Sequence, residues 1–142
     1  NSPIDSGENY KFTVTGTDAT VFAMGSSSMF TESIPSSTSI PRIYSKSLGS
    51  SSSSLGVDGI IGVETPQTYE AAILISNKLE SGKSYSFVKG GSLGGTLYNS
   101  DAKVYFPATV TGGSSVSATA STSASSTSSN TPGGSSGPGG NR

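Results

Sequence analysis

The tyrosines are the residues of this sequence best suited to hold a ligand. Six Tyr are present and no Trp, which argues against a flat, tryptophan-lined platform for crystalline polysaccharide. A tyrosine ring can still stack on the C–H face of a sugar while polar neighbours bind the sugar hydroxyl groups. The candidate carbohydrate-binding residues are Tyr44, Tyr69, Tyr98, Asn99, Asp101 and Tyr105. The alternative for each tyrosine is a half-buried core position with its hydroxyl group in water.

Acidic residues near the N-terminus are the candidate metal ligands. The chain has no His and no Cys, so only oxygen ligands are available, and these suit Ca²⁺. The candidate ligands are Asp5, Glu8 and Asp18. No D-x-[DN]-x-[DN]-G calcium loop occurs, and the alternative is that these acids are exposed turn residues.

The same composition argues against catalysis. Nucleophilic catalysis usually needs a His, a Cys or a tuned partner for Ser. Ser–Lys neighbours such as Ser81 with Lys83 occur, but a chain so rich in Ser contains them by chance. The nine acids are spread thinly, without the carboxylate pair of a glycosidase. We therefore expect a protein that is not an enzyme.

Charge and hydropathy limit the partners. The net charge is −1 and the Lys and Arg residues are scattered, so no basic stripe predicts nucleic-acid binding. No apolar run approaches the ~20 residues that span a bilayer, so no membrane insertion is expected. The first six residues are mostly polar, which is expected if a signal peptide has been removed or if the chain is part of a longer one.

Composition changes abruptly at Gly112–Gly113. From Ser114 to Arg142 the chain has one Val and no Leu, Ile, Phe or Tyr. Such a segment has little apolar area to offset the entropy lost on ordering. We predict an all-β domain over residues 1–113 and a disordered Ser/Thr/Gly-rich tail over 114–142. The tail resembles a plain linker or an O-glycosylated stalk in composition.

Short apolar runs separated by turn residues predict the strands of the domain. The expected strands are 10–15, 20–24, 40–48, 69–76, 84–89, 96–98 and 103–110, with flexible loops at 49–54 and 90–95. Residues 69–76 are the most apolar run and predict a central strand buried on both faces. Asp58–Gly59 predicts a hairpin with a type I′ turn. Pro107 predicts an edge position or a bulge. The expected fold is a small sandwich-like or β-solenoid-end domain.

Two stretches resemble a known family. The first, residues 5–29, includes Val21-Phe22-Ala23-Met24-Gly25 and Met29; the second, residues 69–91, includes Ser76, Leu79, Gly82, Tyr85, Gly90 and Gly91. Together with Thr96-Leu97-Tyr98 they look like the C-terminal part of secreted bacterial carbohydrate-binding domain proteins. Those proteins are non-catalytic parallel β-helices similar in shape to pectate lyases.

The resemblance implies a secreted or cell-surface protein that binds a polysaccharide. Residues 1–29 would be the last solenoid coil, 40–110 the C-terminal strands, and upstream coils a partner. The repeated coils themselves are not in this sequence, so none of their sites is carried over. The alternative function is structural: a surface-fibre, anchoring or capping module that self-associates through edge strands.

Overall fold

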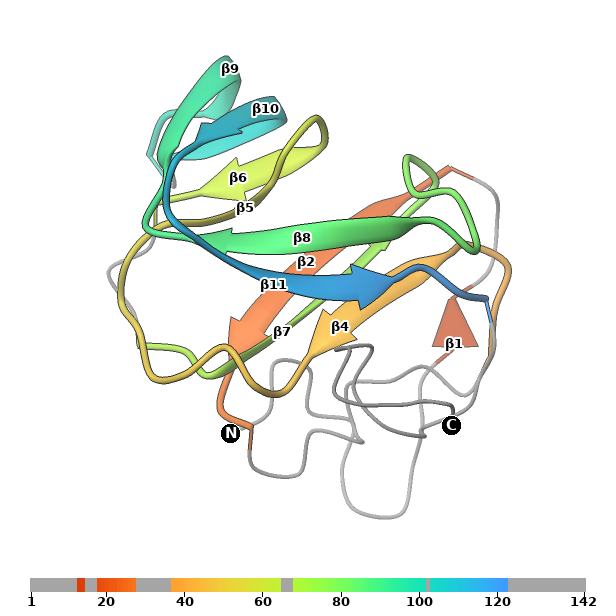
Figure 1. The fold of residues 1–142 in the computed structure, drawn as a ribbon. Coiled ribbons are helices and arrows are strands. Elements are labelled where there is room, and N and C mark those ends of the chain that lie inside the picture. Colours follow the sequence, from red (N-terminus) through yellow and green to blue (C-terminus); the bar gives the residue numbers. More distant parts are fainter. Residues whose placement is uncertain (1–12, 15–17, 28–36, 65–67, 102, 123–142) are drawn as a thin grey trace.

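The protein is all-β, with two antiparallel sheets arranged like a sandwich (Figure 1). The computed structural model describes residues 13–14, 18–27, 37–64, 68–101 and 103–122, and no helix occurs among them. The strands are β1 (Thr13–Val14), β2 (Thr20–Gly25), β3 (Ser37–Thr38), β4 (Arg42–Ser45), β5 (Leu55–Val57), β6 (Ile61–Val63), β7 (Ala71–Ser76), β8 (Ser84–Lys89), β9 (Ser92–Asn99), β10 (Val104–Thr111) and β11 (Ser114–Thr119). β1 and β3 form a separate, short parallel pair.

The smaller sheet has the strand order β2-β7-β4, and β7 is its central strand. All six residues of β7 are buried, which confirms the prediction of a central strand covered on both faces. Ala72 and Leu74 contribute to one apolar cluster, and Ala71, Ile73 and Ile75 to another. The alternation of a strand therefore divides β7 between two apolar layers. Of the predicted solenoid coil, 1–29, the structure describes 13–14 and 18–27, and β2 lies antiparallel to β7.

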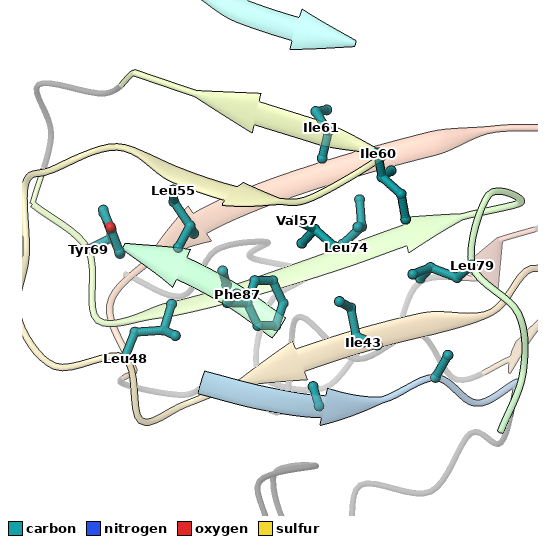
Figure 2. Packing of buried hydrophobic residues seen from close by; sticks show 13 residues of the cluster. Ile43, Leu48, Leu55, Val57, Ile60, Ile61, Tyr69, Leu74, Leu79 and Phe87 are labelled. Atoms are coloured by element: carbon teal, nitrogen blue, oxygen red, sulfur yellow. The ribbon is translucent and has the colours of Figure 1, made fainter. Parts of the chain in front are cut away.

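The larger sheet has the order β11-β8-β5-β6-β10-β9. Figure 1 shows β8 and β11 crossing in front of β2, β7 and β4, while the β5–β6 and β9–β10 strands form the upper left of the domain. The main core lies between these layers. It includes Phe87 from β8, Leu74 from β7 and Ile43 from β4, which Figure 2 shows pointing into one space.

The hairpin predicted at Asp58–Gly59 is present, but its turn differs. Val57 pairs with Ile61, so three residues form the loop instead of two. Gly59 has a φ of 88°, whereas a type I′ turn also needs a positive φ at Asp58, which is not among the positive-φ residues. The reason is Ile60, which is 5% exposed and belongs to the main core. The three-residue loop thus supplies a side chain to the core as well as the turn.

The hairpin holds the neighbouring strand β10 in place. The Gly59 N–H donates to the Ala108 carbonyl (2.8 Å), and the Val110 N–H donates to Asp58 Oδ1 (2.9 Å). Gly56 lies so close to β10 that a Cβ there would stand 2.8 Å from Val110 Cγ2. A residue with a side chain could not be accommodated without a shift. These contacts hold β10 close to β5. Because β9 pairs with β10, both strands are fixed relative to the core.

The boundary predicted after Gly113 is wrong for the residues that follow it directly. Ser114–Thr119 form β11, which pairs with all six residues of β8. Ala118 and Ala120 are 0% and 2% exposed, and both belong to the main core. Arg42 and Ser121 then exchange two backbone hydrogen bonds of 2.9 and 3.1 Å. Residues 123–142 of the predicted tail lie outside the described residues.

A search of the described residues for a helix long and apolar enough to cross a membrane found none.

Candidate functional site

A cleft of about 360 Å³ lies where β9 and β10 face the ends of β2 and β7. Its volume falls in the range of small-molecule sites, roughly 300–1,000 Å³. Its described lining residues are Asp18, Ala19, Thr20, Ile61, Asn77, Lys78, Tyr98, Val104 and Phe106. They come from five separate segments of the chain, so only the tertiary fold brings them together. The cleft has an apolar side on the larger sheet and a polar side around the start of β2 and the β7–β8 turn.

Tyr98 and Phe106 form the aromatic side of the cleft. Their ring centroids are 6.0 Å apart and the ring planes stand at 90°, an edge-to-face contact that favours a fixed orientation. Tyr98 is nevertheless 72% exposed, so most of its surface is open to a ligand.

Two bulges place these rings. Val104 pairs with Asn99 and Tyr105 with Leu97, which leaves Tyr98 as an extra residue in β9. Between Tyr105 and Ala108 the extra residue is in β10, so Pro107 lies at a bulge as the sequence predicted. Bulges redirect side chains and are frequent beside functional sites.

Hydrogen bonds hold the polar side of the cleft. Thr20 Oγ1 and Ser76 Oγ are 2.8 Å apart, and the Lys78 N–H donates to Ser76 Oγ (3.0 Å). The Asn77 N–H donates to the Ala19 carbonyl (3.2 Å). The buried hydroxyl of Ser76, which is 0% exposed, therefore connects β2 to the β7–β8 turn. The backbone that carries Asp18, Asn77 and Lys78 is thereby preorganised.

The structure separates the residues predicted to bind a sugar. Tyr98 lines the cleft, and Asp18, predicted as a metal ligand, lines it as well. Asn99 and Asp101 are exposed at the end of β9 and in the turn after it, and Tyr105 is half-buried in β10; none of the three is among the cleft residues.

Tyr44 and Tyr69 are corrected to core residues. Each is 2% exposed, so neither offers a ring face to a ligand in solution. Tyr69 belongs to the main core, and its hydroxyl group donates to the Ser54 carbonyl (3.2 Å). Tyr44 belongs to the second apolar cluster. Both tyrosines are core residues, but they are fully buried instead of half-buried, and the Tyr69 hydroxyl group bonds to the protein backbone instead of to water.

Thr20, Asn77, Lys78 and Phe106 were not predicted as site residues. One feature of the sequence could have indicated Asn77 and Lys78 as site residues: both begin a turn directly after the most apolar strand. Phe106 precedes a proline in a strand, which is where a bulge is expected. Neither signal indicates that these residues meet.

The calcium prediction is only partly covered by the structure. Asp5 and Glu8 lie outside the described residues. Within the described part of the chain, no group of three or more His, Cys, Asp or Glu residues could hold a metal ion.

Among the described residues, the most buried cation lies away from the cleft, next to Tyr44. Arg42 is 2% exposed, its guanidinium carbon is 5.6 Å from the Tyr44 ring centroid, and its Nη1 donates to the Ser121 carbonyl (3.1 Å). Burial lowers the pKa of Arg42, an effect opposed by Tyr44. Burial raises the pKa of Tyr44 above its ordinary value of 10.0, an effect opposed by Arg42.

The raised pKa of Tyr44 predicts a loss of stability at alkaline pH. Above about pH 10 the unfolded chain loses the Tyr44 proton while the folded chain keeps it, so the free energy of unfolding falls as pH rises. Tyr44→Phe removes this titration. We expect the stability of the wild type relative to Tyr44→Phe, measured by urea unfolding, to decrease from about pH 9 to pH 11. A pH-independent difference would contradict the assignment. The other ionisable groups are present in both proteins, so the difference reports the loss of the Tyr44 hydroxyl group together with its interaction with Arg42.

No protein-family model matches the chain, and searches of curated proteins and of solved structures found no match either.

Proposed function

We propose that the protein is a non-catalytic carbohydrate-binding module that holds a segment of polysaccharide in the cleft beside Tyr98. The observation that supports it best is an aromatic ring, 72% exposed, next to a cleft with a hydrogen-bonded polar side. An exposed tyrosine ring beside a cleft offers an apolar face and a polar hydroxyl group to the same ligand.

The two sides of the cleft match the two surfaces of a sugar ring. A pyranose has C–H faces that pack on an aromatic ring and hydroxyl groups around its edge. Tyr98 and Phe106 would contact the faces. Thr20 and Asn77 would bind hydroxyl groups, since a hydroxyl and an amide can both donate and accept.

The charges of the cleft favour a neutral polysaccharide. Among its described lining residues, Asp18 and Lys78 are the ionisable groups that are charged near pH 7, and their charges are opposite. A strongly anionic polymer such as polygalacturonate would meet Asp18 without an excess of cations. We therefore expect neutral glucans, mannans or xylans to bind better than acidic polymers.

The absence of His and Cys and the single acid among the described cleft residues support a binding role over catalysis. A secreted or cell-surface location, and upstream β-solenoid coils as a partner, are parts of the proposal that rest on the family resemblance alone. The binding proposal does not need them, because the cleft is formed within the described residues.

Removing the exposed ring should weaken binding. We expect the wild type to bind at least one neutral polysaccharide in affinity electrophoresis and calorimetry, and Tyr98→Ala to raise the Kd on the order of tenfold or more, as truncating a central aromatic contact usually does. Tyr98→Phe keeps the ring and should retain most of the affinity.

Tyr105→Ala is the matched control, because it makes the same change in the same sheet outside the cleft residues. Its affinity should equal that of the wild type, with melting temperatures recorded for all variants. If the wild type binds no neutral polysaccharide, or if Tyr105→Ala and Tyr98→Ala weaken binding equally, the cleft is not the binding site.

A further inference from the structure

We propose that the cleft binds a polysaccharide of N-acetylated amino sugars, whose acetamido group lies between the charged pair Asp18 and Lys78 and the aliphatic part of the lining. This inference rests on the proposed function, because it names the class of sugar that the same cleft would take. Two parts of the lining, its aliphatic residues and its charged pair, favour this class over plain hexose polymers.

The aliphatic residues among the described lining of the cleft are Ala19, Ile61 and Val104. A plain hexose polymer carries hydroxyl groups around the edge of each ring. A hydroxyl group turned toward these three side chains loses its water and gains no hydrogen bond, which costs free energy. The methyl group of an acetamido substituent can lie there instead, and its burial is favourable. An N-acetylated sugar therefore matches a part of the lining that a plain sugar does not use.

Asp18 and Lys78 lie on two neighbouring segments at the polar side of the cleft. β2 and β7 pair in antiparallel fashion, and just beyond this ladder the Asn77 N–H donates to the Ala19 carbonyl (3.2 Å). Asp18 directly precedes Ala19 in the chain. Lys78 directly follows Asn77, and both charged residues line the cleft. The fold thus brings a negative and a positive side chain to the same end of the ladder.

These two side chains match the two polar atoms of an acetamido group. A carboxylate only accepts hydrogen bonds, and an ammonium group only donates them. The acetamido group offers one N–H and one carbonyl oxygen, so its N–H can donate to Asp18 while its oxygen accepts from Lys78. Hydrogen bonds to charged groups are stronger than those between neutral groups. The acetamido group is itself uncharged, in agreement with the opposite charges of the pair.

Three trisaccharides with the same linkage, which differ in one substituent of each ring, test this inference. Triacetylchitotriose carries the acetamido group, cellotriose a hydroxyl group and deacetylated chitotriose an amine. We expect calorimetry of the full chain to give a Kd for triacetylchitotriose on the order of tenfold below that for cellotriose, as a buried methyl group and one more hydrogen bond imply. Deacetylated chitotriose should bind more weakly than the acetylated sugar, because it lacks the methyl group and the carbonyl oxygen.

Variants of the charged pair test where the acetamido group lies. Asp18→Ala and Lys78→Met should each reduce the preference for triacetylchitotriose over cellotriose by at least about threefold. Asp101→Ala and Lys46→Met are the matched changes outside the cleft residues and should keep the preference. The ratio of the two Kd values is the readout, because damage to the fold would weaken the binding of both sugars. An unchanged ratio in both cleft variants would overturn the assignment of this pair.

Failure of this inference can be told apart from failure of the proposed function. If cellotriose binds as tightly as triacetylchitotriose, the acetamido class is wrong and the binding function stands. The same holds if another neutral polysaccharide binds through Tyr98 and triacetylchitotriose does not bind. Tighter binding of deacetylated chitotriose would also overturn the inference, because recognition would then depend on an amine. If no neutral saccharide binds, the inference and the proposed function are both refuted.

Discussion

Ending the chain at Gly113 is expected to unfold the protein, whereas a chain ended at Thr122 is expected to fold. The shorter chain lacks β11, which forms the ladder with all of β8. It also lacks Ala118 and Ala120, both buried in the main core, and the partner of the Arg42 backbone. Each lost hydrogen bond costs about 1 kcal/mol, and the core opens on one side. The total is comparable to the stability of a small domain, about 5–15 kcal/mol.

Circular dichroism and urea unfolding of the two truncated chains measure this difference. The chain ended at Thr122 keeps every described strand, so it separates the loss of β11 from the loss of residues 123–142. A cooperative unfolding transition in the chain ended at Gly113 would show that β11 is dispensable.

The two truncations test residues 114–122, for which the prediction from the sequence and the structure differ. The apolar content of residues 114–122 is one Val and two Ala, and this low content predicted disorder. Val116, Ala118 and Ala120 nevertheless alternate with Ser and Thr, and this alternation places all three toward the main core. Alanine buries little area, but Ala118 and Ala120 are 0% and 2% exposed in this core. For these residues, the alternation of apolar and polar side chains indicates the strand correctly, whereas the low apolar content wrongly predicts disorder.

Strong local patterns were predicted correctly. β8 spans Ser84–Lys89 as expected, and β7 is central because five of its six residues are apolar. The glycines of 90–95 were interpreted as a flexible loop, but β9 begins at Ser92. Gly95 has a φ of 102°, and a Cβ there would lie 2.4 Å from the Pro107 carbonyl oxygen. Glycine marks a close approach of two strands at this point, which a single sequence does not distinguish from a loop.

The cleft could be predicted only in part. A tyrosine in a strand has the same local pattern whether it is buried or exposed, so Tyr44, Tyr69 and Tyr98 were equivalent in the sequence. What separates them is long-range packing: Tyr44 lies among Ile40, Ile73 and Ile75, while Tyr98 sits on the last strand of a sheet. Asp18 and Tyr98 are eighty residues apart in the chain, and no local rule joins them.

Phe87→Ala should cost about 3–5 kcal/mol of the free energy of unfolding, the range for removing a fully buried Phe ring. Phe87 is 0% exposed, and its ring is stacked on Phe22 with centroids 6.5 Å apart and planes at 9°. Figure 2 shows it at the centre of the core, among Leu48, Val57 and Ile43. Its neighbours come from both sheets, so the cavity left by alanine cannot close by moving one strand.

The stability of Tyr98→Ala should be compared with that of Phe87→Ala, because Tyr98 belongs to the candidate site and Phe87 to the core. It also removes an aromatic ring from the larger sheet, but from a side chain that is 72% exposed. Its effect on the free energy of unfolding should stay below about 1.5 kcal/mol, because the ring is largely exposed and its edge-to-face contact with Phe106 is worth about 0.5–1.5 kcal/mol. Urea midpoints of the two variants measure the contrast. If Tyr98→Ala destabilises the protein as much as Phe87→Ala does, the exposed ring supports the fold, and its loss could not be used to test sugar binding.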